Sequence, residues 1–311
     1  QGFPCGGSQT RSQTTGVPLH PQACQLAQHG GNRNQFAHLV YNDPKLRAEY
    51  EIIFGSMPDI SDLNRFPAQA GPVNNKAANS AWDAMSTADQ NIISEIFVNI
   101  GKSIAAYETK LQPAPSRFDH YVKAALNNDL GQMKKLYTDD EAVGLRIFIS
   151  ETNCTICHSG PLLTDKGFHN ISVLPRTLGK YDWGRFVGAQ QVVKSPFNCR
   201  SSYNDAPPRG QQKPCDELKY IVRARHETSG AMKTPSLRNV SKTAPYMHAG
   251  QYKTLRKVIE HYNDPPQSLS RKSELFLKVN LNEREMDQLV EFLKSLDSPI
   301  DTQAELRVAP K

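Results

Sequence analysis

The pentapeptide Cys154-Thr-Ile-Cys157-His158 constrains this chain more than any other feature of its sequence. On a helix, positions i, i+3 and i+4 share one face, so both thiols and the imidazole can reach one planar group. Cys-x-x-Cys-His is the attachment signature of a c-type haem. It predicts thioether bonds from Cys154 and Cys157, with His158 as proximal ligand of the haem iron. A redox dithiol needs no following histidine, and a zinc site needs a second pair of ligands that does not appear.

A low-spin haem needs a second axial ligand, and residues 230–262 offer several candidates. Met247 is attractive on chemistry alone, because it lies in a loop beside a proline and a glycine, where constrained backbone can aim the side chain. A methionine is also a common filler of hydrophobic cores, so the pattern by itself leaves the choice open. The candidates are Met232, Met247, His248 and His261.

Length and composition describe a globular chain. The 311 residues are enough for two domains, and 38% hydrophobic with 22% charged residues excludes a disordered chain. The net charge of +6 is spread along the sequence, which argues against nucleic acid and suits at most docking to an acidic protein. No apolar run of 18 residues predicts a membrane span. No signal peptide is visible, and the start at Gln1 fits a processed or truncated product.

Hydrophobic periodicity predicts a mainly α fold, because strand signals are few. The strongest helix is expected over 87–111, where Ser86 and Asp89 resemble a capping box before an apolar stripe. Further helices are expected over 36–54 (broken near Pro44), around Trp82, and over 117–127, 139–150 (capped by Thr138), 254–262 and 283–296 (capped by Asn282), with loops over 1–34, 55–75 and 159–230.

The other four cysteines predict disulfides if the chain matures in an oxidising compartment. Cys199 and Cys215 flank a segment rich in Pro, Arg, Ser and Asp that cannot build much core, so a bridge would close that loop. Cys5 and Cys24 could pair likewise, and free thiols are the alternative for all four.

Two longer stretches carry a family resemblance. "CTICHSGPLLTDKGFHNISV" and "KTPSLRNVSKTAPYMHAGQYKTLRKVIEHY" resemble the second half of the bacterial di-haem cytochrome c peroxidases, a family that includes the methylamine dehydrogenase maturation enzymes. "IGKSIAAYETKL" and "SRFDHYV" are similar to the segment ahead of the second haem. The likeness covers residues 30–297 and implies two cytochrome c-like domains, each with a c-type haem.

By this resemblance, the haem on Cys154 and Cys157 is the high-potential, electron-accepting haem of the family. His158 and Met247 are then its axial ligands. A thioether ligand favours ferrous iron and raises the potential. The maturation enzymes use a tyrosine ligand on the corresponding haem, so a methionine here favours the peroxidase branch.

Three further roles are implied by the same motifs. Arg238 is expected near a haem propionate, with a structural ion pair as the alternative. His169 is expected at the haem edge. A calcium ion, which the family holds between its domains, is expected near Thr234-Pro235, with a plain turn as the alternative.

The family's N-terminal, peroxidatic haem has no counterpart here, because no second Cys-x-x-Cys-His occurs in the sequence. Catalytic residues are therefore not assigned, and His20, His29 and His38 are read as ordinary histidines. The expected fold is mainly α, with two pseudo-repeated cytochrome c-like domains of which the N-terminal one is incomplete. Residues 1–115 would be its remnant and 116–311 the C-terminal domain with covalent haem. The second haem is expected upstream, unless it was lost or comes from another chain.

The expected function is that of a periplasmic di-haem peroxidase-type oxidoreductase, represented by its electron-accepting half. Its partners would be hydrogen peroxide and a small electron-donor protein, a cytochrome c or a cupredoxin, and the family commonly forms homodimers. An electron-transfer c-type cytochrome without peroxidase activity is the alternative, because six-coordinate iron has no open position for peroxide. A related haem oxidase that modifies a partner protein is a third reading.

Overall fold

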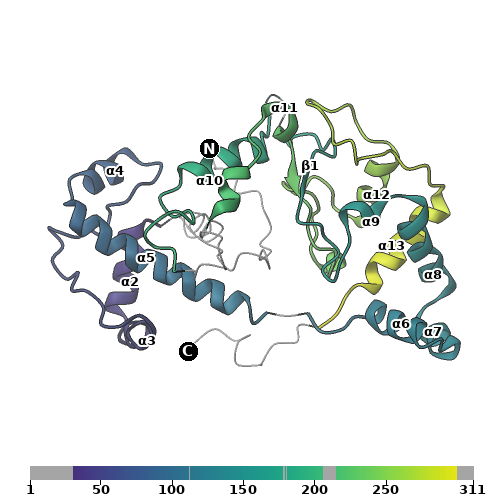
Figure 1. Ribbon diagram of the computed structural model, residues 1–311, viewed down its shortest axis with the longest axis horizontal. Coiled ribbons are helices and arrows are strands. Elements are labelled where there is room, and N and C mark those ends of the chain that lie inside the picture. The colour runs from purple at the N-terminus through teal and green to yellow at the C-terminus, as the bar shows by residue number, and fades with distance from the viewer. Residues whose placement is uncertain (1–30, 112, 178, 180, 206–214, 300–311) are drawn as a thin grey trace. The chain divides into compact units, whose positions relative to one another are not determined.

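The computed structural model describes residues 31–299 except 112, 178, 180 and 206–214. The described residues form two compact units (Figure 1). We call residues 110–193 and 220–299 the haem-motif unit, and residues 31–109 and 194–219 the helical unit. Helices are the main regular element of both, which confirms the mainly α class. Cys5, Cys24, His20 and His29 lie outside the described residues.

The helices of the helical unit start at residues whose side chains cap their first turn. Asp43 caps the second helix, and Pro44 occupies its first position, where a missing N–H costs nothing. The predicted helix over 36–54 is therefore two helices. Ser86 caps the longest one by accepting a hydrogen bond from the Asp89 N–H. The helices are α2 (Arg33–Asn42), α3 (Pro44–Phe54), α4 (Lys76–Asp83) and α5 (Thr87–Glu108).

The core of the helical unit is filled by its own side chains. Ile60, Phe66 and Ile93 are fully buried in it. His38 is buried with them, and its Nε2 lies 2.8 Å from the Phe66 carbonyl oxygen, so it is an ordinary core histidine as predicted. The predicted disulfide between Cys199 and Cys215 is present, with 5.3 Å between the two Cα atoms.

The haem-motif unit contains more and shorter elements. Its strands β1 and β2 form an antiparallel pair in which His169 faces Met232. In chain order the elements are α6 (Arg117–Leu126), α7 (Leu130–Leu136), α8 (Asp139–Arg146), the π-helix η1 (Ile147–Glu151), α9 (Cys154–Cys157), β1 (Phe168–His169), α10 (Arg185–Lys194), α11 (Arg225–Thr228), β2 (Met232–Lys233), the 3-10 helix η3 (Val240–Lys242), α12 (Leu255–Asn263) and α13 (Glu283–Ser295). The 3-10 helix η2 (Asp216–Tyr220) belongs to the helical unit up to residue 219.

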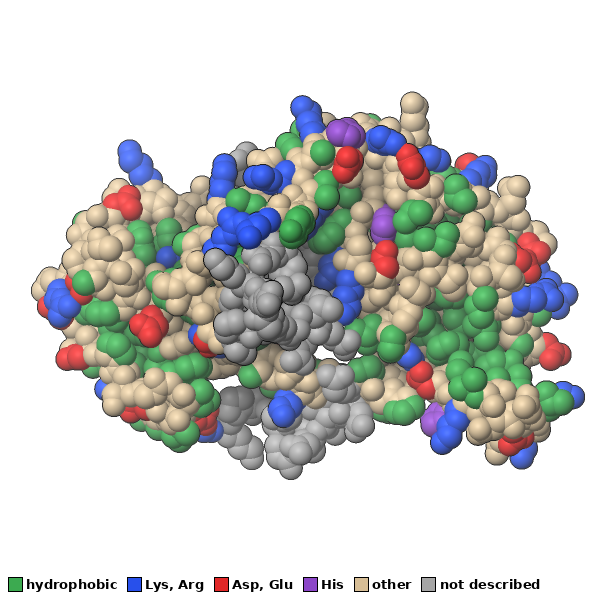
Figure 2. All heavy atoms as spheres, in the orientation of Figure 1, with side chains coloured by type: hydrophobic (Ala, Val, Ile, Leu, Met, Phe, Trp, Pro, Cys, Tyr) green, Lys and Arg blue, Asp and Glu red, His purple; other side chains and the backbone are tan. Residues whose placement is uncertain are grey.

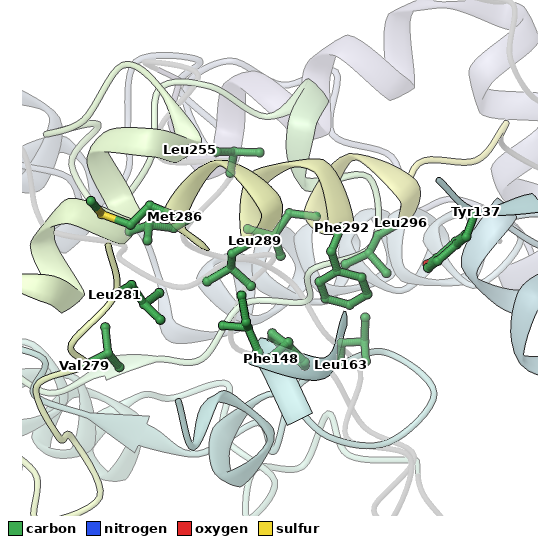
Figure 3. Close-up of a cluster of buried hydrophobic side chains, with 13 residues drawn as sticks. Tyr137, Phe148, Leu163, Leu255, Val279, Leu281, Met286, Leu289, Phe292 and Leu296 are labelled. Carbon is green, nitrogen blue, oxygen red and sulfur yellow. The ribbon is translucent and has the colours of Figure 1, made fainter. Parts of the chain in front are cut away.

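The core of the haem-motif unit forms where α8 and η1 pack against α13 (Figure 3). Gly144 permits this close approach, because a Cβ there would lie 2.0 Å from the Gln288 carbonyl oxygen. Phe148 and Phe292 meet with 5.0 Å between ring centroids. Leu163, from the loop that follows the Cys-x-x-Cys-His motif, joins the same cluster. The segment that carries the chemistry is therefore anchored directly to the core.

Three elements differ from the sequence expectations. Helix α10 lies within 159–230, which was expected to be loop; its glycine and three valines lower helix propensity, but packing buries Ala189 completely. Helix α7 has seven residues and no buried side chain, so it has no periodicity to detect. The helix expected over 139–150 becomes a π-helix at Ile147.

Charged side chains are dispersed in the part of the surface that Figure 2 shows, where basic and acidic groups alternate over much of the visible face. This agrees with the modest net charge of +6. Within the described residues, no helix is both long enough and apolar enough to cross a bilayer.

Candidate functional site

The two cysteines of the motif lie at opposite ends of the short helix α9. The chain enters this helix from η1 through Asn153, whose φ of 56° is left-handed. π-helical turns of this kind occur often at functional sites. Neither Cys154 nor Cys157 is in a disulfide, and both are half-buried. Two thiols one turn apart on one helix are what covalent attachment of a porphyrin requires.

Cys154 lies against the hydrophobic core shown in Figure 3. Its Sγ is 3.1 Å from the Thr152 hydroxyl oxygen, and that hydroxyl donates to the Ile147 carbonyl oxygen, 2.9 Å away, at the start of the π-helix. Burial raises the pKa of the Cys154 thiol above its ordinary value. A protonated thiol beside an apolar wall suits addition to the vinyl group of a largely apolar ring.

His158 is held by one ring nitrogen. Its Nδ1 lies 3.0 Å from the Leu163 carbonyl oxygen. A carbonyl only accepts, so Nδ1 carries the proton and Nε2 keeps its lone pair. Burial lowers the pKa of His158, which keeps the imidazole neutral. A neutral imidazole whose other nitrogen is anchored to the backbone is the usual form of a histidine metal ligand. The residues of the motif therefore fit a c-type haem.

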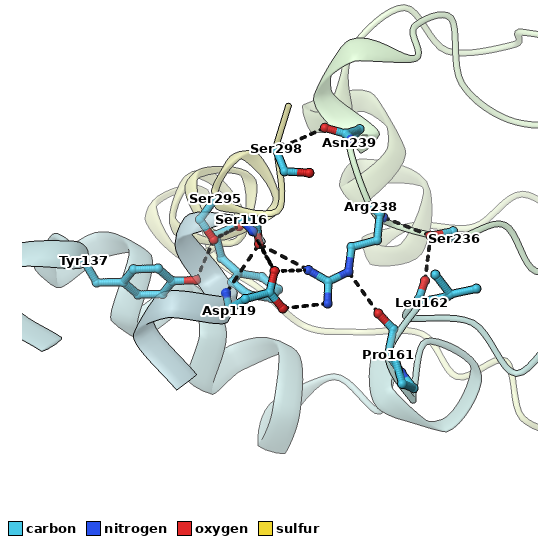
Figure 4. A network of polar contacts seen from close by, with 11 residues as sticks. Ser116, Asp119, Tyr137, Pro161, Leu162, Ser236, Arg238, Asn239, Ser295 and Ser298 are labelled. Carbon is cyan, nitrogen blue, oxygen red and sulfur yellow. Dashed lines mark hydrogen bonds and ion pairs between the residues drawn. The ribbon is translucent and has the colours of Figure 1, made fainter. Parts of the chain in front are cut away.

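Arg238 makes an ion pair (Figure 4). Its guanidinium donates to both carboxylate oxygens of Asp119, at 2.6 and 2.8 Å, and its Nε donates to the Pro161 carbonyl oxygen at 3.0 Å. Burial alone would raise the pKa of Asp119, but hydrogen bonds from Arg238 and Ser116 lower it to about 2. The structural ion pair considered from the sequence is thus present, and the propionate role stays a prediction.

His169 lies beside Cys157. Its Nε2 is 2.7 Å from the Asp165 carboxylate, and the ligating atoms of Cys157, Asp165 and His169 all lie within 4.8 Å of one another. Hydrogen bonds to Cys157 and, against the effect of burial, to Asp165 raise the pKa of His169 to about 9. The haem-edge role of His169 stays a prediction. So does the calcium ion near Thr234, whose carbonyl oxygen accepts from the Thr164 hydroxyl at 2.8 Å.

Met247 lies in a tight loop with unusual backbone geometry. Tyr246 pairs with Tyr252 in an antiparallel bridge, and the Gly250 N–H donates to the Met247 carbonyl oxygen at 3.1 Å. Met247 itself has a φ of 69°. This left-handed conformation is costly for a residue with a long side chain, and such residues cluster at functional sites. Tyr246 packs against the same core cluster as Cys154.

Two of the alternative axial candidates, His261 and His248, have other side-chain contacts. The two ring nitrogens of His261 lie 3.0 Å from the Tyr252 hydroxyl and 2.7 Å from the Ile171 carbonyl oxygen, so this imidazole is structural. His248 lies 3.5 Å from the Asp182 carboxylate. Met232 is part of β2.

Sequence reasoning missed two polar residues that organise this region. Asp119 holds Arg238, and its signal was available, since Ser116 and Asp119 form a capping box at the start of α6. Ser236 donates to the Leu162 carbonyl oxygen at 2.6 Å. A serine in a loop has no sequence signal of its own, because its partner is 74 positions away in the chain.

Comparison with known proteins gives sequence relatives among cytochrome c peroxidases and MauG proteins. No protein-family model matches the chain. It is 29% identical over 199 residues to the cytochrome-c peroxidase IdrP1 of Pseudomonas sp. (strain SCT), which covers 63% of this chain and 48% of the relative. It is 27% identical over 203 residues to the methylamine utilization protein MauG of Methylophilus methylotrophus, covering 64% and 46%. The cytochrome c peroxidase Ccp of Escherichia coli (strain K12) is 25% identical over 203 residues, covering 64% and 32%.

Among solved structures, the chain is similar to the diheme peroxidase BthA from Burkholderia thailandensis, with a TM-score of 0.46, 18% identity, and coverage of 86% of this chain and 59% of the other. A MauG-like protein associated with microbial copper homeostasis gives a TM-score of 0.38 and 23% identity, with coverage of 78% and 65%. The chain spans about half the length of the curated relatives it matches first. The homologues of this chain are di-haem cytochrome c peroxidases and MauG proteins, the family that its haem motif and its "KTPSLRNVSKTAPYMHAGQYKTLRKVIEHY" stretch predict.

Proposed function

We propose that this chain is the electron-accepting part of a di-haem peroxidase-type oxidoreductase. Cys154 and Cys157 would bind one c-type haem covalently, and His158 and Met247 would bind its iron. The bound haem supplies a one-electron carrier, whose potential a thioether ligand raises. Cys154, Cys157 and His158 would hold this carrier in place.

The observation that carries this proposal is the anchored imidazole of His158. Its Nδ1 is bonded to the Leu163 carbonyl oxygen, which leaves Nε2 as the nitrogen available to a metal. The two unpaired thiols lie at the ends of the helix directly before it. The backbone of Met247 supports its assignment, because a left-handed conformation at a methionine is maintained only when the surroundings demand it.

Peroxide reduction belongs to the whole protein in this proposal. The haem held by Cys154 and Cys157 would supply the site that accepts electrons from a small cytochrome c or cupredoxin, and a second haem would supply the site of hydrogen peroxide reduction to water. The sequence contains no second Cys-x-x-Cys-His, so that haem would belong to a longer form of the protein or to another chain. We place the protein in the bacterial periplasm, where c-type haems and a disulfide such as Cys199–Cys215 can form.

A MauG-type oxidase that modifies a partner protein is the second candidate. It is favoured by one observation, that the relatives include MauG proteins at almost the same identity as the peroxidases. Met247 favours the peroxidase over the oxidase, since the resemblance implies a tyrosine ligand in the MauG branch. Tyr246 is adjacent, but its hydroxyl donates to the Ser241 carbonyl oxygen at 3.4 Å.

The test combines haem stoichiometry with turnover. The pyridine haemochrome assay counts covalent haem per polypeptide in the chain and in the longest protein its gene encodes. Two haems in the long form, with peroxide-dependent oxidation of reduced cytochrome c, support the peroxidase. One haem without peroxide turnover would make the chain an electron-transfer cytochrome. Oxidation of a protein partner, with none of a small cytochrome, would favour the MauG-type oxidase.

A further inference from the structure

The loop directly after the haem motif offers three successive carbonyl groups, and each is held by a different side chain. The Pro161 oxygen accepts from Arg238 Nε at 3.0 Å, the Leu162 oxygen accepts from the Ser236 hydroxyl at 2.6 Å, and the Leu163 oxygen lies 3.0 Å from His158 Nδ1. The Leu163 carbonyl group, which orients His158, therefore follows two carbonyl groups that are held in place by side chains from another segment of the chain.

Those outside contacts come from one short segment, Thr234–Arg238, which lies along the loop. At its start, the Thr234 carbonyl oxygen accepts from the Thr164 hydroxyl at 2.8 Å. At its end, the Arg238 N–H donates to Ser236 Oγ at 3.1 Å. The two segments are thus joined by side chain-to-backbone hydrogen bonds at Pro161, Leu162 and Thr164.

Arg238 is itself held in place from α6. The two carboxylate oxygens of Asp119 accept hydrogen bonds from the Arg238 guanidinium, and Ser116 Oγ lies 3.2 Å from the same guanidinium (Figure 4). Only 14% of the Arg238 side chain is exposed, and its charge lies 5.8 Å from the Phe118 ring centroid. A bidentate arginine–carboxylate pair fixes direction as well as distance. The contact to Pro161 is therefore rigid.

We propose that Arg238 and Ser236 are positioning residues that set the strength of the His158 Nδ1–H hydrogen bond through the Pro161–Leu163 loop, and so tune the reduction potential of the haem. This rests on the proposed attachment of haem at Cys154 and Cys157. A strong bond from Nδ1–H to a carbonyl makes the imidazole a better electron donor, which favours ferric iron and lowers the potential. When the loop loosens, that bond weakens and the potential rises.

A matched control lies on the same helix as Asp119. Arg117 also pairs with both oxygens of a carboxylate, that of Glu141, and also donates to a carbonyl oxygen, that of Leu136 at 3.2 Å. Its contacts do not reach the loop at 161–163. Arg117→Gln therefore removes the same kinds of interaction from the same unit, without touching the support of His158.

The experiment compares Arg238→Gln, Ser236→Ala and Arg117→Gln in the haem-containing protein. Spectroelectrochemical titration gives the midpoint potential, and thermal unfolding gives stability. We expect both arginine variants to lose stability, but only Arg238→Gln to raise the potential, by a tenfold shift of the reduction equilibrium, which is 59 mV for one electron. Ser236→Ala should shift it in the same direction by less.

Two results would overturn the inference. One is an unchanged potential in Arg238→Gln and Ser236→Ala while the haem remains attached and histidine-ligated. The other is an equal rise in Arg117→Gln, which would indicate general loosening. If the wild-type chain attaches no haem, the proposed function fails instead. Hydrogen exchange at the Leu163 and Thr164 amides then still tests whether Arg238 holds the Pro161–Leu163 loop in place. Faster exchange in Arg238→Gln than in Arg117→Gln supports this role, and equal exchange refutes it.

Discussion

The two units each contain a histidine bonded to a backbone carbonyl, but the haem site that we propose uses only one of them. His38 in the helical unit uses Nε2 to bond the Phe66 carbonyl oxygen, inside a core of fully buried side chains. His158 in the haem-motif unit uses Nδ1 and leaves Nε2 available, one residue after a thiol. The same kind of hydrogen bond is thus structural in one setting and would orient the proposed metal ligand in the other. The nitrogen engaged and the neighbouring thiols make the difference.

Two arginines, one from each unit, show two different roles. Arg33 in the helical unit lies over aromatic rings, with its Cζ 4.5 Å from the Phe197 ring centroid and 5.2 Å from that of Trp82, and burial lowers its pKa to about 10. Arg238 instead bonds a carboxylate and a carbonyl. An arginine among rings fills space, whereas one fixed by a carboxylate can hold backbone in place.

The largest effect is expected from removing the two thiols of the haem-motif unit. Replacing both Cys154 and Cys157 by Ser should abolish covalent haem, because no thioether can form. Haem staining after denaturing electrophoresis measures it. Cys199→Ser with Cys215→Ser is the matched control in the helical unit: it should keep the haem but lose about 3 kcal/mol of stability, the typical cost of opening a loop of this size. Covalent haem surviving in the first double variant would refute the attachment site.

The second effect tests the proposed distal ligand. Met247→Ala should lower the haem potential on the order of 0.1 V, within the span that axial ligands control, and open a coordination position. The near-infrared band of thioether–iron charge transfer should disappear. Met232→Ala, in β2, is the control and should retain both band and potential. An unaltered band in Met247→Ala would show that another residue binds the iron.

The third effect tests how the haem-motif unit holds its core together. Gly144→Ala should destabilise the protein by about 3 kcal/mol, because the added Cβ would meet backbone atoms of α13 that cannot move aside. Gly188→Ala in α10 is the control, since nothing lies within 4 Å of its added Cβ, and it should be neutral or slightly stabilising. Urea denaturation measures both. Equal stabilities in the two variants would contradict the close helix contact.

The smallest effect concerns two carboxyl groups with lowered pKa. The pKa of Asp119 is about 2 when folded against an ordinary 3.8, so its contribution to stability is complete above about pH 4 and is lost as the pH falls through 2. Asp119→Asn should therefore cost at most about 2 kcal/mol at neutral pH, and its difference from wild type should shrink below pH 4 in urea titrations.

Asp59 in the helical unit is the carboxyl group to compare with Asp119. Its hydrogen bond from Tyr41 lowers its pKa, also to about 2, but this carboxyl group is exposed to solvent. Asp59→Asn should cost less than Asp119→Asn, because solvent screens exposed charges. Added salt should reduce the Asp59 effect further and leave the Asp119 effect largely intact. The reverse order would mean that the ion pair to Arg238 contributes nothing.

Local patterns in the sequence predicted what depends on neighbours in the chain. The spacing Cys154-x-x-Cys157-His158 predicts its own geometry on a helix, and the caps of the long helices lie where Ser86, Thr138 and Asn282 place them. The disulfide between Cys199 and Cys215 is of this kind as well, since it closes a short loop. These features follow from interactions over a few residues, or from one covalent bond.

Only the tertiary structure decided what depends on distant parts of the chain. Helix α10 forms although its sequence has weak helix propensity, because packing buries Ala189. Arg238 meets Asp119 across 119 positions, and Ser236 reaches Leu162 across 74. A hydrogen bond over such separations leaves no periodic trace in the sequence, because it exists only once the core of α8 and α13 has brought its partners together. The sequence predicted which group the chain binds, and the fold would determine how firmly the proposed ligand is held.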